Sequence, residues 1–297
     1  MCRAINFIGQ INKNMDTDSG GYFTSSTLFK TSLLTISFST IYLYRSEKAF
    51  QFFQPAAIKE DTVTAIQLPA IKVRKKKTIY LTFDDGPNKG TQKLINIIDA
   101  EQIPATMFLV GEHVYGSREQ HNIYDSLVCN KFIEIANHSF THAFENRYRR
   151  FYDLPDSVVN DFERCADSLQ LTSNIVRTPG RNIWRTKNIS STDIKTTSAA
   201  ADSLLTKGFT AVGWDLEWHF TNDQRLVQTD SQLLRQIDSV FVNKKTKTAD
   251  QLVLLAHDRS FFSSTDSSAL HRLIIELKKL DEYNFETVSK YPGLGTQ

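Results

Sequence analysis

The stretch LTFDDGPNKG, residues 81–90, decides how the rest of the chain is interpreted, because it sets two aspartates side by side. Asp84 and Asp85 follow an apolar run typical of a buried strand and directly precede a Gly-Pro turn. Adjacent carboxylates repel each other, and a bound cation relieves that repulsion. The pair therefore predicts a metal site whose other ligands come from elsewhere in the chain.

The composition sets limits on the class of protein. The chain has 297 residues, of which 40% are hydrophobic, enough for one substantial core with appendages. A formal net charge of +2 gives no indication of general nucleic-acid binding. The three cysteines, Cys2, Cys129 and Cys165, have neither an even count nor CxxC spacing, which argues against a disulfide framework and a thiolate zinc site.

The N-terminal segment TLFKTSLLTISFSTIYLY, residues 27–44, is mostly apolar and is followed by Arg45. Its length is marginal against the roughly 20 residues of a spanning helix. Three interpretations remain open: an uncleaved membrane anchor, a cleaved export signal, and a buried or disordered extension. We expect residues 1–45 to form an export signal or anchor and residues 46–77 a linker, with the protein membrane-anchored or secreted and acting outside the cytoplasm.

Beyond residue 77, short apolar runs alternate with amphipathic helical patterns, which favours a parallel α/β architecture. One such helix is expected to start at Asp156 or Ser157, which are good cap residues. The predicted strands are 78–83, 105–110, 131–136, 209–214 and 251–256.

Polar residues follow four of these runs directly or after one residue. They are Asp84 with Asp85, His138, Asp215 and His257. The carboxyl ends of parallel strands lie on one face of a barrel, so these groups are expected to converge. An open doubly wound sheet also fits the alternation, but the chain has no Gly-rich phosphate loop after the first strand, and the polar residues favour a barrel.

The segment NHSFTH, residues 137–142, places His138 and His142 at H-x3-H spacing. Two neutral imidazoles and one carboxylate are the protein ligands of a catalytic zinc site, which keeps a position for water. One of the two adjacent aspartates would then bind the metal, while its neighbour accepts the proton of the water. The remaining histidines fit no motif and are expected to be surface or structural; they are His113, His121, His219 and His271.

With these motifs in order, the chain resembles the polysaccharide deacetylases of the NodB-homology type, carbohydrate esterase family 4. The resemblance covers residues 78–290 and implies a distorted (β/α) barrel preceded by the N-terminal apolar segment. The matching motifs are TFDDG (82–86), HSFTH (138–142), RTPGR (177–181), DLEW (215–218) and LAH (255–257). The first two match in full, and the third and fourth are weak when taken alone.

The resemblance assigns a role to each motif residue. Asp85, His138 and His142 would hold one divalent ion, with zinc expected, and Asp84 would be the general base. Arg177 would keep Asp84 ionised and oriented, although an ordinary surface arginine is the alternative.

The later motifs would serve the leaving group and the acyl group. Pro179 would shape the loop so that the Gly180 amide faces the developing oxyanion. His257 would be the general acid, its pKa raised by a nearby carboxylate such as Asp215.

Trp218 and Leu255 would form an apolar groove for the acetyl methyl, with a plain core role as the alternative for Leu255. Family members usually carry an aromatic residue where this chain has Gly180, so Trp184 or Trp214 is expected to supply the sugar platform unless the substrate differs. The shortened fourth motif leaves open whether Asp215 or Glu217 tunes His257.

These roles imply a hydrolase of linear amides that removes N-acetyl groups from an amino-sugar polymer, such as peptidoglycan, a chitin-like polymer or an exopolysaccharide. The expected partner is an acetylated carbohydrate, and no nucleic acid is expected. Two alternatives remain: an O-acetyl esterase acting on a plant polymer such as xylan, and a catalytically silent glycan-binding module on the same fold.

Overall fold

The structure is a computed structural model that describes residues 75–294, all within one compact unit. The expected export segment, residues 27–44, and all but the last three residues of the expected linker lie outside the described residues. Within residues 75–294, no helix has the length and apolar character needed to cross a membrane.

The centre of the fold is one mainly parallel sheet in the strand order β6-β5-β7-β4-β3-β2-β1-β9-β8, with β10 also pairing β1. The sheet is strongly curled into a half-barrel, which confirms the expected distorted barrel. The parallel strands are β1 (Lys77–Gly86), β2 (Ala105–Leu109), β3 (Ile133–Asn137), β4 (Ile175–Val176), β7 (Thr210–Ala211), β8 (Leu216–Glu217), β9 (Gln251–His257) and β10 (Tyr283–Phe285). At one edge, β5 (Ile183–Arg185) runs antiparallel to β6 (Ser190–Thr192) and to β7.

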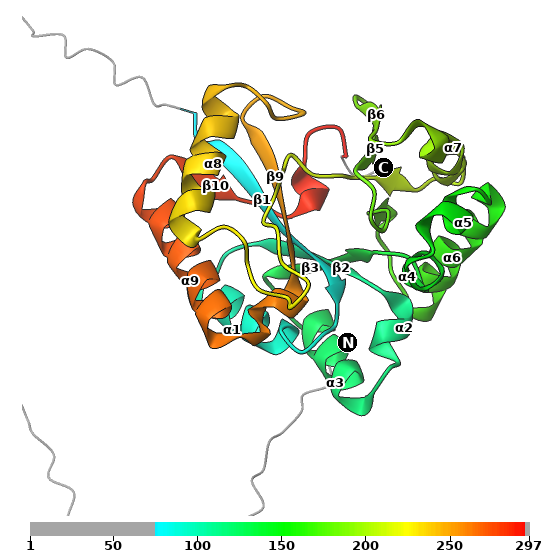
Figure 1. The fold of residues 1–297 in the computed structure, drawn as a ribbon, viewed down its shortest axis with the longest axis horizontal. Coiled ribbons are helices and arrows are strands. Elements are labelled where there is room, and N and C mark those ends of the chain that lie inside the picture. Colours follow the sequence, from blue (N-terminus) through cyan, green and yellow to red (C-terminus); the bar gives the residue numbers. More distant parts are fainter. Residues whose placement is uncertain (1–74, 295–297) are drawn as a thin grey trace, which may run out of the picture. The chain divides into compact units, whose positions relative to one another are not determined.

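Helices cover the sheet, with α1, α8 and α9 on one side of the view in Figure 1 and α5, α6 and α7 on the opposite side. The helices are α1 (Thr91–Glu101), α2 (Gly111–Val114), α3 (Arg118–Val128), α4 (His142–Asn146), α5 (Tyr148–Tyr152), α6 (Pro155–Ser168), α7 (Ser198–Thr206), α8 (Asp230–Val242) and α9 (Ser264–Lys279). Three short 3₁₀ turns complete the described chain: η1 (Lys195–Thr197), η2 (Asp258–Phe262) and η3 (Val288–Lys290).

Helix α6 starts earlier than the sequence predicts. Its first residue is Pro155, and its N-cap, Leu154, forms no side-chain cap hydrogen bond. Proline suits the first helical position because its φ is already close to the helical value and its missing N–H has no partner there in any case. The expected cap at Asp156 or Ser157 is therefore wrong.

Successive side chains of β1 point alternately to the main apolar core and to the face of the sheet that carries the site. Ile79, Leu81 and Phe83 lie in the main apolar cluster with residues of α1, α8 and α9. Tyr80 lies instead in a separate cluster with Trp184. Because successive side chains of a strand point to opposite faces, Thr82 and Asp84 share the face of Tyr80. This periodicity directs Asp84 away from the main core, at the carboxyl end of the strand.

Candidate active site

The two adjacent aspartates reach the same site because the strand is irregular between them. The pairing of β1 with β2 shifts register between Asp84 and Gly86, and Asp85 has a φ of 74°. In a regular strand, Asp84 and Asp85 would point to opposite faces. The bulge and the left-handed backbone at Asp85 turn its carboxylate back toward the same edge of the sheet.

Asp85, His138 and His142 form a compact cluster whose ligand atoms all lie within 4.8 Å of one another. Asp85 Oδ1 lies 3.3 Å from Nε2 of His138 and 3.1 Å from Nε2 of His142. The same Oδ1 atom is buried and has no hydrogen-bond partner. A buried oxygen without a partner is costly, and a cation between the three side chains would satisfy it. The donor set therefore fits a divalent metal ion.

The histidines of this cluster are held in the state that binds a metal. Burial is the largest cause that lowers the pKa of His138, to about 4, and it also lowers the pKa of His142, so both imidazoles are neutral near pH 7. His138 donates from Nδ1 to the carbonyl oxygen of Arg177 at 2.8 Å, which leaves its Nε2 lone pair facing Asp85. A backbone carbonyl that fixes the tautomer is the usual outer support of a metal-binding histidine.

A further histidine supports the cluster from behind. His113 donates from Nδ1 to the backbone oxygen of Asp85 at 2.7 Å, and burial lowers its pKa to about 4. The sequence predicts only a surface or structural role for His113. The structure gives His113 a structural role, since it supports the backbone of Asp85. No sequence motif marks this particular contact.

His142 lies at the start of an unusual backbone segment. From His142 to Asn146, five consecutive non-glycine residues have φ between 49° and 67°, which makes α4 a left-handed turn. Each such residue costs on the order of 1–2 kcal/mol, so the surrounding structure must hold the turn in place. Thr141 contributes by accepting the backbone N–H of Phe144 at 3.0 Å.

Asp84 is paired with a buried arginine. Arg177 donates from Nη1 to Asp84 Oδ1 at 2.9 Å, and their side chains are 0% and 4% exposed. Arg177 also donates to Thr82 Oγ1 and to the carbonyl oxygens of Val212 and Gly213. The surface-arginine alternative is therefore wrong. The geometry is that expected of an arginine that holds the Asp84 carboxylate in a fixed orientation.

His257 stands next to Asp84 across the strand ladder. The parallel pairing of β1 and β9 makes the two residues Cα partners, so their side chains share one face of the sheet. His257 Nδ1 is buried without a hydrogen-bond partner. Burial lowers the pKa of His257 to about 4, against the opposing effects of Asp84 and Glu217. The expectation that a carboxylate raises this pKa above its ordinary value is therefore wrong, because burial outweighs the neighbouring charges.

Of the two acids that the sequence leaves open, Glu217 rather than Asp215 acts on His257. The Asp215 carboxylate accepts the backbone N–H groups of Lys247 at 2.7 Å and Val253 at 2.8 Å. Burial raises the pKa of Asp215 to about 6. Asp215 therefore ties β9 to the preceding loop, and its predicted role as the partner of His257 is not supported.

Burial rules out one of the expected substrate contacts. Trp184 is 0% exposed, packs against Tyr291 with ring centroids 5.4 Å apart, and donates from Nε1 to Asn182. It cannot stack on a sugar, so its predicted role as the platform is wrong. Trp218 and Leu255 are also buried, at 0% and 2% exposure, and are joined by a backbone hydrogen bond of 2.8 Å. Their role as the acetyl groove stays a prediction.

The aromatic ring missing from the third motif is supplied from another segment. Gly180 has a φ of 63°, and a Cβ atom placed there would lie 2.7 Å from the ring of Tyr148. The Tyr148 ring also lies edge-on to His142, at 6.0 Å between centroids. Tyr148 therefore takes the space that a side chain at Gly180 would fill. Next to it, Pro179 accepts the Tyr152 hydroxyl at 2.7 Å, which fixes the loop.

On the opposite side stand two residues that the motifs do not mark, Arg259 from η2 and Phe220 from the loop that follows β8. Arg259 forms an ion pair with Asp85, and its guanidinium lies 5.6 Å from the ring of Phe220. The Phe220 ring is edge-on to His257 at 4.6 Å. The only sequence signal for Arg259 is its position two residues after His257.

A curled, mainly parallel sheet with an Asp-His-His cluster at its carboxyl edge defines the class of the NodB-homology barrel. Comparisons with known proteins agree with this class. The sequence profile of the polysaccharide deacetylase family matches residues 72–186. Over this range the chain matches the polysaccharide deacetylase family, carbohydrate esterase family 4.

Three relatives illustrate the similarity. The peptidoglycan-N-acetylglucosamine deacetylase of Bacillus cereus is 26% identical over 191 residues, covering 62% of this chain and 61% of the relative. A chitooligosaccharide deacetylase of Sinorhizobium fredii is 29% identical over 143 residues, covering 47% and 58%. The catalytic domain of the peptidoglycan N-acetylglucosamine deacetylase of Eubacterium rectale superimposes with a TM-score of 0.53 at 20% identity, covering 75% of this chain and 94% of that one. The chain thus spans less than two thirds of the length of both curated relatives.

Proposed function

We propose that this protein is a metal-dependent deacetylase that hydrolyses N-acetyl groups on an amino-sugar polymer. The observation that carries the proposal is the pairing of two sites at one sheet edge. The Asp85, His138 and His142 cluster lies beside a buried Asp84 that is fixed by Arg177. The cluster can hold a metal ion that acts as a Lewis acid, and Asp84 can act as a general base. Hydrolysis of an amide by water needs both functions.

A divalent ion held by Asp85, His138 and His142 would polarise the acetyl carbonyl and make water more acidic. The other steps belong to side chains of this chain. Asp84 takes the proton of the attacking water, and the ion pair with Arg177 holds its carboxylate in position for that purpose. The Gly180 amide would donate to the developing oxyanion. The C–N bond then breaks, giving acetate and a free amine.

The leaving nitrogen needs a proton as this bond breaks, and His257 is the residue proposed to provide it. With its pKa lowered to about 4, His257 is neutral near pH 7. It therefore has to gain a proton during the reaction. Asp84, its Cα partner on β1, has by then received the proton of the water. A proton that passes from Asp84 to His257, and from His257 to the leaving nitrogen, gives each of these two residues a role in the reaction.

The proposed substrate follows the relatives. Two of the proteins compared are named for deacetylation of N-acetylglucosamine in peptidoglycan, and one for deacetylation of chitooligosaccharides. The apolar segment at residues 27–44 supports the further proposal that the protein acts outside the cytoplasm on a polymer of the cell envelope. Zinc is the proposed ion, because the two histidines and one aspartate match its preferred ligands.

The test is release of acetate by the purified full chain from chitooligosaccharides, from peptidoglycan and from acetylxylan, with Asp84→Asn as the matched inactive control. We expect release from one of the first two substrates, abolished by a chelator and restored by Zn²⁺. Release from acetylxylan alone would replace the proposal with an O-acetyl esterase. Binding of a glycan without any acetate release, in a metal-loaded protein, would leave the silent glycan-binding module.

A further inference from the structure

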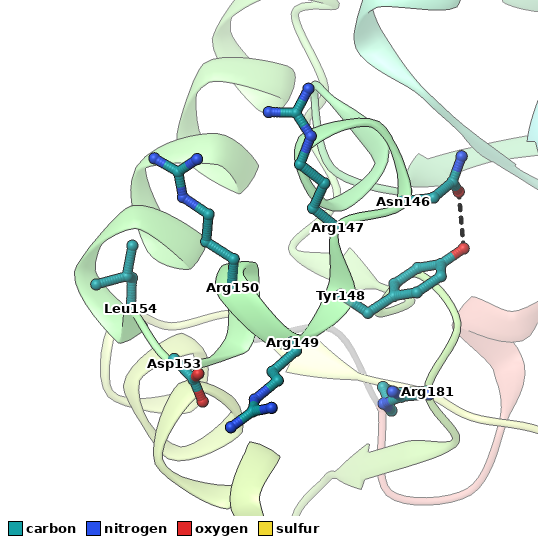
Figure 2. Close-up of a pocket in the computed structure, with 8 residues that line it drawn as sticks. All are labelled: Asn146, Arg147, Tyr148, Arg149, Arg150, Asp153, Leu154 and Arg181. Atoms are coloured by element: carbon teal, nitrogen blue, oxygen red, sulfur yellow. Dashed lines mark hydrogen bonds between the residues drawn. The ribbon is translucent and has the colours of Figure 1, made fainter.

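An open pocket of about 750 Å³ lies beside the metal cluster, along α5 and the turn that precedes it. Its lining is strongly basic: Arg147, Arg149, Arg150 and Arg181 stand around Tyr148, and Asp153 is the one acid among the lining residues. In Figure 2, Arg147 and Arg150 extend to one side of α5 and Arg149 to the other. The cationic groups are thus spread along the pocket, which suits several charges on a polymer better than one small anion.

These arginines are poorly neutralised. Arg149 and Arg150 are exposed, and within residues 75–294 neither side chain forms an ion pair. Arg147 lies 3.7 Å from Glu145, but both side chains are largely exposed, so this pair contributes little. Arg181 Nε is buried and has no hydrogen-bond partner. The pocket therefore has cationic donors without counter-charges, in a chain whose formal net charge is only +2.

Tyr148, which lines the pocket, also contacts a ligand residue of the metal cluster. One edge of this ring faces His142, and the guanidinium of Arg181 lies 5.6 Å from its centre. Arg181 follows Gly180, whose amide is assigned to the oxyanion. A polymer with its acetylated sugar at the metal cluster would pass Tyr148 and place its next units against the arginines. Aromatic rings are suited to this passage because they pack against the apolar faces of sugars.

We propose that this pocket binds anionic sugar units that flank the acetylated residue, so that the preferred substrate is an acidic acetylated glycan. The inference rests on the proposed function for the position of the acetylated sugar. Guanidinium groups recognise carboxylate and phosphate through paired, charge-assisted hydrogen bonds, so either group on the polymer meets the requirement. A glycan is favoured over a nucleic acid because the pocket offers one aromatic ring, shared with the metal cluster, rather than a series of stacking platforms.

The test measures the Kd of the full chain for three hexamers at low and at physiological salt. They are neutral chitohexaose, a hyaluronan hexasaccharide that carries carboxylates, and a chemically phosphorylated chitohexaose. We expect at least one acidic hexamer to bind about tenfold more tightly than the neutral one, with the preference shrinking as salt rises. The acidic hexamer with the lower Kd shows whether the pocket prefers carboxylate or phosphate.

Two variants locate the effect. The double variant Arg149→Gln/Arg150→Gln should lose most of the preference for the acidic hexamer, measured as the ratio of its Kd to that of chitohexaose. Arg235→Gln is the matched control, because Arg235 is also exposed, has no ion pair within residues 75–294, and lies on α8, on the other side of the view in Figure 1. It should keep the full preference.

Equal Kd values for all three hexamers would overturn the proposal, as would a preference that survives in the double variant or is lost equally in Arg235→Gln. A hexathymidylate that binds as tightly as the better acidic hexamer would also overturn it, since the pocket would then select charge alone. Binding and deacetylation are read separately. If the protein prefers the acidic hexamer but releases no acetate, the proposed function is contradicted, while the proposal that the pocket binds anionic sugar units is not.

Discussion

The site has two halves that are built differently. Asp84, His257 and Arg177 lie on or directly after β1, β9 and β4, where ladder hydrogen bonds fix the backbone on both sides. His142 and Tyr148 lie on the left-handed turn and short helix between β3 and α6, where exposed residues outnumber buried ones. We refer to these as the strand half and the loop half. The strand half is largely buried and its backbone is fixed by strand pairing, whereas the loop half presents a more open, charged surface.

This difference suggests a division of labour. Buried groups with fixed partners serve the chemistry, because low dielectric and fixed geometry strengthen their interactions. Loops on a rigid scaffold vary more easily, so they are the usual place for substrate selection. Substitutions in the strand half should therefore change turnover or stability strongly, and substitutions in the loop half should change substrate preference by smaller factors.

The largest effect is expected for Asp84→Asn. Loss of the general base should lower acetate release by about 10²–10⁴-fold, on amide and ester substrates alike, because both need a deprotonated water. Metal content should stay near that of the wild type, since the three ligand residues are unchanged. Loss of metal in Asp84→Asn together with its retention in Asp85→Asn would show that the two carboxylates have the opposite roles.

Arg177→Met tests whether the strand half is held by its buried ion pair. The substitution removes donors to Asp84, Thr82 and two backbone carbonyls, and it leaves Asp84 as a buried charge without its partner. The free energy of unfolding should fall by about 3–5 kcal/mol, measured by urea denaturation. Arg150→Met, at an exposed position of the loop half, is the control and should change it by about 0.5 kcal/mol or less.

The two halves also differ in how far the sequence predicts them. Strand ends are marked by apolar runs, so Asp84, His138 and His257 could be placed at one edge of the sheet from the pattern alone. Strand β4, which positions Arg177, has only two residues and no detectable periodicity. Burial is set by tertiary packing, which is why the sequence misplaced Trp184 and misjudged the pKa of His257.

The loop half could not be predicted from the sequence for a different reason. A left-handed turn of non-glycine residues has no sequence signature, because local preference disfavours it. Tyr148 and Arg181 meet only through this turn and through the missing side chain at Gly180. The departure at Gly180 was visible in the sequence, but the ring that compensates for it comes from a segment some thirty residues earlier.

His257→Ala examines the leaving-group step within the strand half. An amine must be protonated as it leaves, whereas a phenolate leaves readily as an anion. We expect a loss of about 10²-fold on an acetamide substrate and a much smaller loss on an aryl acetate. Equal losses on the two substrates, in a folded protein with its metal content unchanged, would assign His257 to positioning instead of proton transfer.

Asp215 gives a pH-dependent test of stability in the strand half. Burial raises its pKa from 3.8 to about 6, so the folded state holds a proton more tightly than the unfolded state does. The resulting stabilisation is fully present below about pH 4 and is lost as the pH rises through about 6. The free energy of unfolding of the wild type, taken relative to Asp215→Asn, should therefore fall over this range and level off above it. A relative rise over the same range would contradict the burial effect.

The smallest effect is expected in the loop half, at the contact between Gly180 and Tyr148. Gly180→Ala places a Cβ atom 2.7 Å from the Tyr148 ring and puts alanine at a φ of 63°. The backbone alone should cost about 1 kcal/mol of unfolding free energy. The contact with the ring should increase this loss of stability, and displacement of the ring should raise KM more than it lowers kcat.

A double-mutant cycle with Tyr148→Ala separates the backbone cost from the cost of the contact. In the Tyr148→Ala background the ring is gone and only the backbone cost remains, so Gly180→Ala should be less destabilising there by about 0.5–1 kcal/mol. If Gly180→Ala costs the same in both backgrounds, Tyr148 moves away freely, and the ring is not held in place by the loop. A substrate platform needs a fixed ring, so that result would also remove Tyr148 from the path between the metal cluster and the arginines.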